Sequence, residues 1–242
     1  MRILITNDDS VSASQLAPLI RFCQTLGEVT TVVPKFEQSG KSHSIELKKA
    51  FEAKKVELEP GLWVYTVDSS PADCVRFAVM GMGMEFDLVV SGINRGYNIG
   101  MDIMYSGTAA AVFEAAAMGI KAIALSASYK NYEVAKEHLQ TVFDFVHNHN
   151  LFSLHNIYNV NIPPAPKGIR VTRQGGPYYT NLFEPQDNDL YLPVGKCVHE
   201  HKNDLTIDTD ATVEGYISVT PLTINRTDMA AFQQLKGLQA SI

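Results

Sequence analysis

The sequence predicts an α/β protein with a doubly wound, mostly parallel sheet, followed by a β-rich extension and a C-terminal helix. The first 150 residues alternate apolar runs of strand length with helical patterns, as a doubly wound sheet requires. From about Leu151, short strand-like runs separated by Pro, Gly and Asn continue until a helical pattern begins at Met229. We therefore expect a core over 1–150 and an extension over 151–242, within one structural unit whose internal boundary is approximate.

The core is predicted from apolar runs and from the helical patterns between them. Strands are expected at residues 2–6, 28–33, 44–47, 62–67, 86–92 and 121–128. Helices are expected at residues 12–27, 106–119 and 131–148, and a further helix begins at Ser70. Two of these helices start with capping boxes, formed by Ser12 with Gln15 and by Ser70 with Asp73. The alternation of strand and helix predicts helices on both faces of the sheet.

The extension is predicted from strand-like runs at residues 157–164, 169–175, 189–195 and 215–222, with no helix between them. Its final helix places Met229, Phe232, Leu235 and Leu238 at successive steps of three residues. Such spacing produces an apolar stripe on one face of the helix. A stripe on a chain end can pack against its own subunit or against a partner subunit.

Composition excludes several classes of protein. A chain of 242 residues with 20 basic and 26 acidic side chains has a formal charge of -6, which disfavours nucleic-acid polymers and anionic membranes as partners. Three widely separated cysteines indicate neither a disulfide framework nor a zinc knuckle. The N-terminal residues run directly into a strand pattern, and no apolar run approaches the length of a membrane span. We expect a cytoplasmic protein.

Polar residues follow the predicted strands where a ligand site is expected. Asp8 and Asp9 follow the first strand, Asn94 follows the strand over 86–92, and Ser39 lies in the loop after the strand over 28–33. Ligands of open α/β sheets bind beyond the carboxyl ends of the strands. Carboxylate, amide and hydroxyl oxygens favour Mg²⁺, Mn²⁺ or Ca²⁺ over zinc. An ordinary polar turn, with Asp9 capping the next helix, is the alternative.

The glycine-rich segment over 91–108 ends where a helix begins, at Ser106-Gly107-Thr108. Its glycines do not follow the G-x-G-x-x-G spacing of a dinucleotide site. Position 109 is alanine, so this helix lacks the capping box of the helices that begin at Ser12 and Ser70. Its N-terminal N–H groups could therefore bind a phosphate, and plain capping by Ser106 or Thr108 is the alternative.

The run Gly40-Lys41-Ser42 resembles the end of a nucleotide-binding P-loop, but Lys35 stands where the motif G-x-x-x-x-G-K-[ST] needs its first glycine. A P-loop is therefore excluded. Next to this run, His43 has two interpretations. A histidine near a hydrolytic site suits a general acid, and a lone loop histidine also fits a solvated surface position.

Several segments together resemble the SurE family (survival protein E). They are ILITNDD at the N-terminus, Ser39-Gly40 with SHS, SSPADCV from Ser69, DLVVSGINRGYNIGMDIMYSGTAAA from Asp87, NVNIP from Asn159 and TDATVEGYISVTPL from Thr209. These segments span nearly the whole chain, and the block from Asp87 is the most specific of them. The resemblance implies a Rossmann-like core with a β-rich extension.

The resemblance also implies a function. The expected activity is metal-dependent hydrolysis of nucleoside monophosphates, at the 5′ and also the 3′ position, with polyphosphate as a further substrate. The metal, one Mg²⁺ or Mn²⁺ per subunit with Ca²⁺ as another occupant, is expected at Asp8, Asp9, Ser39 and Asn94. The phosphate is expected at Gly40, Asn98, Ser106, Gly107 and Thr108. A homodimer or homotetramer with an exchanged C-terminal element is implied, and either Asp8 or Asp9 is the catalytic proton acceptor.

One departure and two rival functions follow from the same residues. Ser10 stands where the family usually has glycine after the acidic pair, so a positive φ there would be strained. A phosphoaspartate phosphatase would need Asp-x-Asp after the first strand, whereas Asp8 and Asp9 are adjacent. A receiver-like signalling module would need an acceptor aspartate after the central strand, where this chain has Ser91 and Asn94.

Overall fold

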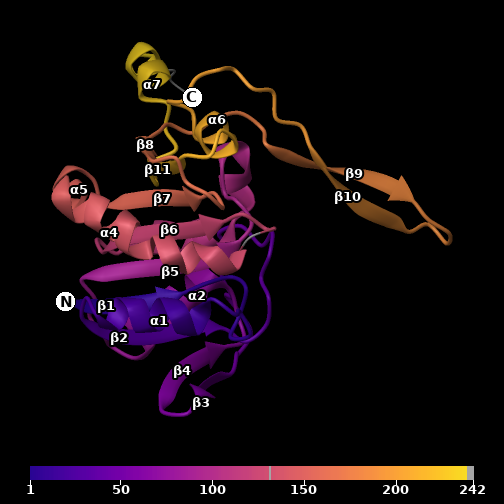
Figure 1. Cartoon of the computed structure of the whole chain (residues 1–242). Coiled ribbons are helices and arrows are strands. Elements are labelled where there is room, and N and C mark those ends of the chain that lie inside the picture. The colour runs from indigo at the N-terminus through magenta and orange to yellow at the C-terminus, as the bar shows by residue number, and fades with distance from the viewer. Residues whose placement is uncertain (131, 239–242) are drawn as a thin grey trace.

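The computed structural model describes residues 1–130 and 132–238, and its central feature is a nine-stranded sheet in the order β3-β4-β2-β1-β5-β6-β7-β11-β8 (Figure 1). Its strands are β1 (Arg2–Thr6), β2 (Glu28–Pro34), β3 (Ala53–Glu59), β4 (Leu62–Val67), β5 (Leu88–Arg95), β6 (Lys121–Ala127), β7 (Ile157–Ile162), β8 (Ile169–Val171) and β11 (Ile217–Pro221). The run from β4 to β7 is parallel, and only the β3–β4 and β7–β11 pairs are antiparallel. The predicted mostly parallel α/β fold is confirmed.

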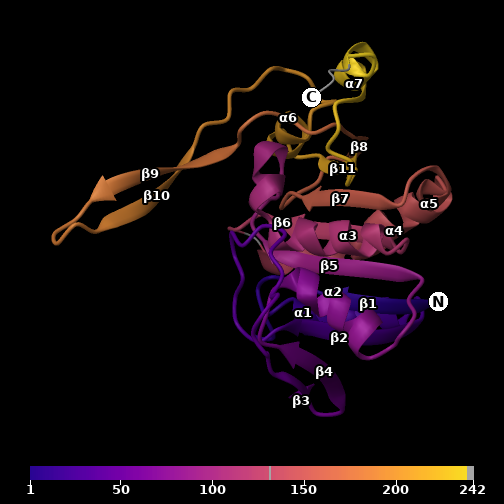
Figure 2. The ribbon, with the colours of Figure 1, turned by 180° about the vertical axis from the view of Figure 1, so that it is seen from behind.

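Helices cover both faces of the sheet because neighbouring residues of each strand point to opposite sides. The helices are α1 (Leu16–Gln24), α2 (Pro71–Arg76), α3 (Gly107–Ala117), α4 (Leu139–Asn148), α5 (Leu151–Leu154), α6 (Asp208–Val213) and α7 (Met229–Leu235). In β1, Ile3 and Ile5 pack in one core with α1 and α4, whereas Leu4 packs in a second core with α2 and α3. Figures 1 and 2 show these two helical layers from opposite sides.

The chain reverses its direction of growth between β1 and β5. From β1 it adds β2 and β4 on one side, and from β5 it adds β6 and β7 on the other. In such a sheet, the two loops that leave the central strands diverge and open a crevice at the carboxyl ends of the strands. This switch point is where a ligand site is expected.

The α1 region corrects one sequence prediction. The helix begins at Leu16 rather than near Ser12, and its N-cap residue Gln15 makes no side-chain capping bond. Instead, the Ser12 N–H donates to the Ser10 hydroxyl, and Gln15 Nε2 donates to Glu133. A local turn bond of Ser12 and a long-range bond of Gln15 therefore replace the predicted capping box. By contrast, Ser70 caps α2 as predicted, accepting from the Asp73 N–H.

The loop after β2 corrects another prediction. Residues 44–47 are not a strand. The edge strand is β3, whose residues are mostly exposed and charged and therefore lack the apolar run that predicts a strand. Contacts with α2 hold the loop in place, because the Ser44 carbonyl accepts from Ser70 and the Glu46 N–H donates to Asp73. The loop that carries Ser39 is thus attached to the start of α2.

The predicted helix over 131–148 is divided. Tyr132–His138 forms a 3-10 helix before α4, while residue 131 lies outside the described residues. Helix α6 was also missed, because its polar sequence resembles a turn. No described helix combines the length and the apolar character needed to cross a membrane.

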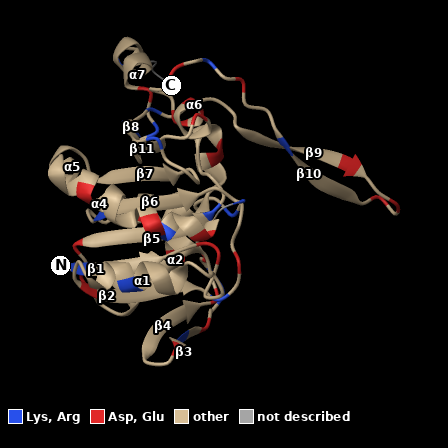
Figure 3. Cartoon of the chain, in the orientation of Figure 1, with Lys and Arg blue, Asp and Glu red and all other residues tan. Residues whose placement is uncertain are grey.

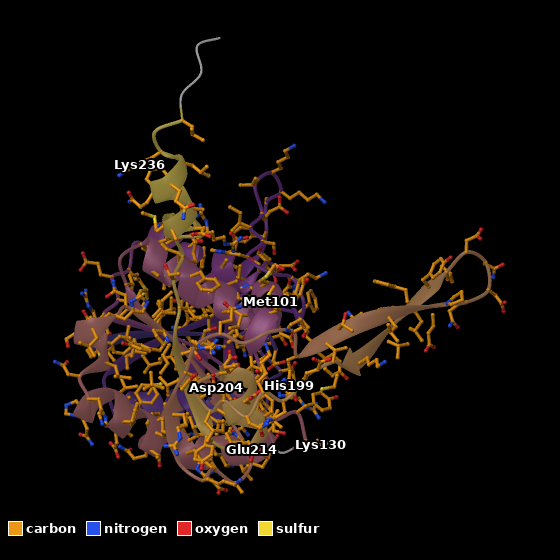
Figure 4. All side chains as sticks on the ribbon, turned by 90° about the horizontal axis from the view of Figure 1, so that it is seen from above. Met101, Lys130, His199, Asp204, Glu214 and Lys236 are labelled. Atoms are coloured by element: carbon orange, nitrogen blue, oxygen red, sulfur yellow. The ribbon has the colours of Figure 1, made fainter. Side chains whose placement is uncertain are left out.

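Residues of the predicted extension take two different places. β7, β11 and β8 continue the main sheet, whereas β9 (Tyr179–Pro185) and β10 (Tyr191–Cys197) form a separate antiparallel ribbon. This β9–β10 ribbon projects away from the body of the molecule (Figures 1 and 4). The division into a core and an extension remains a prediction.

Candidate active site

The predicted site residues gather around the switch point between β1 and β5. Asp8 and Asp9 lie just after the end of β1. Asn94 is the second-last residue of β5, the strand that pairs with β1. The pairing of β5 with β6 shifts in register between Ser91 and Asn94. Figure 3 shows that the loops at this end of the sheet carry both acidic and basic residues.

Asp8 is the most deeply buried carboxylate of the site, with an exposed fraction of 4%. Its Oδ1 accepts a 2.6 Å hydrogen bond from the Thr108 hydroxyl at the start of α3. Burial raises the pKa of Asp8, and the hydrogen bonds from Thr108 oppose that shift. The N-terminus of α3 is thus directed at Asp8, where its positive end stabilises negative charge.

Asp9 is half-buried beside Asp8. Its Oδ2 accepts the backbone N–H of Arg95 at 2.9 Å, which ties the loop after β1 to the end of β5. Burial and then the neighbouring Asp8 carboxylate raise the pKa of Asp9 to about 6. The two carboxylates repel each other unless a cation lies between them.

Ser39 and Asn94 are the two predicted site residues with neutral oxygens. The exposed Ser39 hydroxyl donates to Glu37 Oε1 at 2.6 Å, and both residues line a pocket together with Asp9. Asn94 Nδ2 donates to the Gly96 carbonyl at 2.8 Å, so Oδ1 is the side-chain atom that could bind a cation. Glu37 was not identified from the sequence, although its position two residues before Ser39 could have indicated it.

These residues fit a divalent cation bound by oxygen. Among the residues that the structure describes, no salt bridge joins Asp8 or Asp9 to a basic side chain. The charge of Arg95 is the weakest of the effects on the pKa of Asp9, so protein cations compensate the pair only in small part. Within the same residues, no group of three or more His, Cys, Asp or Glu is arranged to hold a metal. A cation here would draw its remaining ligands from Ser39, Asn94 and water, as Mg²⁺ commonly does.

The start of α3 combines capping with close packing. Ser106 Oγ accepts the Ala109 N–H at 3.0 Å, so the capping that was an alternative to phosphate binding is present. A Cβ atom at Gly107 would lie 2.9 Å from Asp8 Cβ and 3.1 Å from Pro71 Cγ. Gly107 therefore allows the helix terminus to approach Asp8.

Asn98 is held by a buried polar network. Its Nδ2 donates to Ser126 Oγ at 2.9 Å, and its carbonyl accepts from the side chains of Asn159 and Asn161 on β7. The two asparagines were not identified as site residues, although NVNIP places polar side chains unusually within a buried strand. The network fixes the backbone of the loop that leads to α3.

Gly40 and His43 lie in the loop after Ser39. Gly40 has a φ of +68°, and a Cβ atom there would meet no atom within 4 Å. Glycine is therefore favoured at this position by the backbone conformation and not by close packing. His43 Nε2 lies 2.8 Å from Glu114 Oε2, and the other oxygen of Glu114 accepts from Arg76 at 3.0 Å. His43, first, and Arg76 hold the pKa of Glu114 below its usual value. The structure therefore pairs His43 with α3 and, only through Glu114, connects it to α2; its general-acid role remains a prediction.

A pocket of about 770 Å³ opens beside Asp9 and Ser39. Arg95, Tyr129 and Tyr132 belong to its wall, with the Arg95 guanidinium carbon 4.4 Å from the ring centroid of Tyr129. A pocket of this size accepts a small organic molecule. The site thus joins an acidic, oxygen-rich end to an aromatic end.

A Rossmann-like sheet with oxygen-rich side chains at its switch point is typical of ligand-binding α/β proteins. Comparisons with known proteins identify the family within this class. Residues 3–181 match the family model described as Survival protein SurE. The chain is 34% identical to the 5′-nucleotidase SurE of Thermosipho africanus, covering 98% of this chain and 96% of that protein. It is 36% identical to the 5′-nucleotidase SurE of Thermoanaerobacter sp., covering 94% of each.

A solved structure agrees with the sequence relatives. The SurE protein from Aquifex aeolicus has a TM-score of 0.79 and 29% identity, covering 98% of this chain and 99% of that one. The chain belongs to the SurE family. The predictions of the family, of the fold and of an enzyme are thereby confirmed.

Proposed function

We propose that the protein is a 5′-nucleotidase, which hydrolyses nucleoside 5′-monophosphates to a nucleoside and phosphate. The observation that carries this proposal is the Asp8 and Asp9 pair at the switch point, where the buried Asp8 accepts a hydrogen bond from Thr108 at the N-terminus of α3. The similarity to curated proteins named 5′-nucleotidase SurE supports the same substrate class. The 3′-nucleotides and short polyphosphates are further candidate substrates of this site.

In this proposal, Asp8, Asp9, Ser39 and Asn94 hold one Mg²⁺ or Mn²⁺, and Ca²⁺ can occupy the same ligands. A bound ion of this kind lowers the pKa of a coordinated water and neutralises phosphate charge. Thr108 keeps Asp8 in place through its 2.6 Å hydrogen bond. Asp8 or Asp9 accepts the proton of the attacking water.

The phosphate is proposed to lie against the start of α3, beside Ser106, Gly107 and Thr108. Positive partial charge at a helix N-terminus stabilises the charge of the phosphoryl oxygens. The Asn98 network fixes the loop that precedes this terminus, and Gly40 lets the opposite loop approach the phosphate. His43, engaged with Glu114, acts in this proposal on the position of that loop.

The decisive experiment measures phosphate release from nucleoside monophosphates and short polyphosphates with Mg²⁺, with Mn²⁺ or with a chelator. We expect activity that depends on the metal. Whichever of Asp8→Asn and Asp9→Asn removes the proton acceptor should lower kcat by about 10²-fold or more, and both variants should weaken Mn²⁺ binding because each removes a carboxylate ligand. Asp144→Asn on α4, whose side chain is exposed and pairs with Gln140, is the matched control. Titration with Mn²⁺ measures metal binding separately from turnover.

Other outcomes would select another mechanism. Activity that persists with a chelator, or in Asp8→Asn, would contradict the metal assignment. A trapped covalent phosphoenzyme would instead indicate a phosphoaspartate mechanism. Stable labelling by a phosphodonor without phosphate release would indicate a receiver-like module.

We also propose that the chain forms a homodimer or homotetramer by exchanging its C-terminal element. None of the seven described residues of α7 is buried, and its stripe of Met229, Phe232 and Leu235 is about half exposed. The β9–β10 ribbon likewise exposes Leu182, Phe183, Tyr191 and Leu192. Apolar surface of this extent favours contact with a second subunit.

A further inference from the structure

The aromatic end of the pocket carries a stacked pair, Tyr129 over Arg95, that the hydrolytic mechanism does not use. We propose that Tyr129 and Arg95 form a stacking platform for the nucleobase and give the enzyme a preference for purine over pyrimidine nucleotides. This inference rests on the proposed nucleotidase function. It concerns the far end of the substrate, away from the phosphate.

The platform is fixed to the same frame as the hydrolytic residues. Arg95 follows Asn94 directly in β5, and its backbone N–H donates to Asp9 Oδ2 at 2.9 Å. The Arg95 guanidinium then packs on one face of Tyr129, whose residue surface is still 64% exposed. A ring supported on one face and open elsewhere is suited to stacking a planar base.

The adjoining wall of the pocket favours stacking over hydrogen-bond readout. Glu133 lines the pocket, but its Oε1 accepts from Ser14 at 2.7 Å and its Oε2 accepts from Gln15 at 2.5 Å. The Tyr132 hydroxyl donates to the Ile93 carbonyl at 2.8 Å. Because Glu133 and Tyr132, the polar groups of this wall, are already engaged, the platform distinguishes bases mainly by the area of the ring that stacks on it. The larger purine ring therefore binds better, with little difference between adenine and guanine.

The test compares kcat/KM for AMP, GMP, CMP and ribose 5-phosphate, which lacks a base. We expect the wild-type enzyme to favour AMP and GMP over CMP, and CMP over ribose 5-phosphate. Tyr129→Ala should lower the ratio of AMP to ribose 5-phosphate by about tenfold, the size of one base–aromatic stacking contribution. Tyr129→Phe should preserve the ratio, and Arg95→Lys should lower it partly because the planar support is lost.

The matched control is Trp63→Ala. Trp63 is another exposed aromatic residue with a cation near its ring, Lys55, but it lies on β4 outside the pocket. Its substitution should leave the ratio unchanged. Binding of adenosine to the metal-free protein, measured by equilibrium dialysis, gives a second readout that needs no catalysis, and Tyr129→Ala should weaken it by the same factor.

Three results would overturn the platform. They are an equal loss on AMP and ribose 5-phosphate, an unchanged ratio in Tyr129→Ala, and adenosine binding that does not depend on Tyr129. Failure of the proposed function is distinguishable, because the wild-type enzyme would then release phosphate from none of the substrates while adenosine binding still reports on Tyr129.

Discussion

Asp8 brings three separated parts of the chain together. Its side chain accepts from Thr108, its carbonyl accepts from the Gln38 N–H at 2.8 Å, and its Cβ lies against Gly107. The acidic pair after β1 was recognisable in the sequence. The two contacts from α3 and the contact from the Ser39 loop depend on the folded chain.

Gly107→Ala tests this close approach. The added Cβ would lie 2.9 Å from Asp8 Cβ, and because both atoms belong to buried, well-packed groups, overpacking of this kind costs about 1–3 kcal/mol. We expect Asp8 to be displaced, with weaker Mn²⁺ binding and a kcat lowered about tenfold or more, as small misplacements in active sites produce.

Gly237→Ala is the control for this substitution, because its Cβ would meet no atom within 4 Å. Calorimetric Mn²⁺ titration and steady-state kinetics measure the two effects. Wild-type values for both quantities in Gly107→Ala would show that the approach of α3 to Asp8 is unimportant.

Ser10 shows how local hydrogen bonds offset backbone strain. Its φ of +71° is in the left-handed region, where the sequence predicts strain for a serine in place of the family's glycine. For a residue with a Cβ this conformation costs about 1–2 kcal/mol. The Ser10 hydroxyl bonds the hydroxyl and N–H of Ser12, and its carbonyl accepts from Asn7. The same bonds remove Ser12 from its predicted role as a helix cap.

At the scale of elements, the site depends on how loops attach to helices and strands. The 3-10 helix Gly100–Tyr105 connects the glycine-rich loop to α3 and also touches the ribbon, because Asp102 Oδ1 accepts from the Tyr179 N–H at 3.3 Å. Gly100 is further attached to α6 through Asp208. The base of the ribbon, where Figure 4 labels His199, is therefore joined to the loop that precedes the proposed phosphate site at the start of α3.

Asp102→Asn tests this junction through pH dependence. Burial, with a smaller contribution from Asp208, raises the pKa of Asp102 from 3.8 to about 6. The folded state therefore binds this proton more tightly than the unfolded state does. The contribution of Asp102 to stability is greatest below pH 3.8 and falls as the pH rises to about 6.

The asparagine variant should lose that part of the pH dependence, so its Tm relative to wild type should rise between about pH 4 and about pH 6. Thermal unfolding followed by circular dichroism across this range measures the difference, with Asp144→Asn as the exposed control. A constant difference in Tm at all pH values would contradict the assigned pKa. Kinetics at neutral pH would show in addition whether the junction affects turnover.

At the scale of the whole molecule, exposed apolar surface gathers on α7 and on the β9–β10 ribbon. The double variant Phe232→Ser with Leu235→Ser removes the two central apolar residues of the α7 stripe without adding charge. If α7 is exchanged between subunits, this variant should lower the mass in multi-angle light scattering to that of a monomer while the circular dichroism spectrum is retained.

The control is Gln233→Ser with Gln234→Ser, which alters exposed polar residues of the same helix. It should leave the mass unchanged. A wild-type protein that is monomeric at high concentration, or a double variant with wild-type mass, would exclude exchange through α7.

The sequence by itself determined the strands with continuous apolar runs and the helix that Ser70 caps, because apolar periodicity and helix caps are local properties. It also predicted an acidic, oxygen-rich site from the polar residues that follow the strands. It did not reveal β3, β9 or α6, whose polar or short segments carry little periodic signal. Tertiary structure alone decided the strand order that opens the crevice between β1 and β5. It also decided that Glu37 and Asn159 lie near the site and that His43 pairs with Glu114. These contacts join residues distant in the chain, or depend on loop conformation, and so require the packed fold.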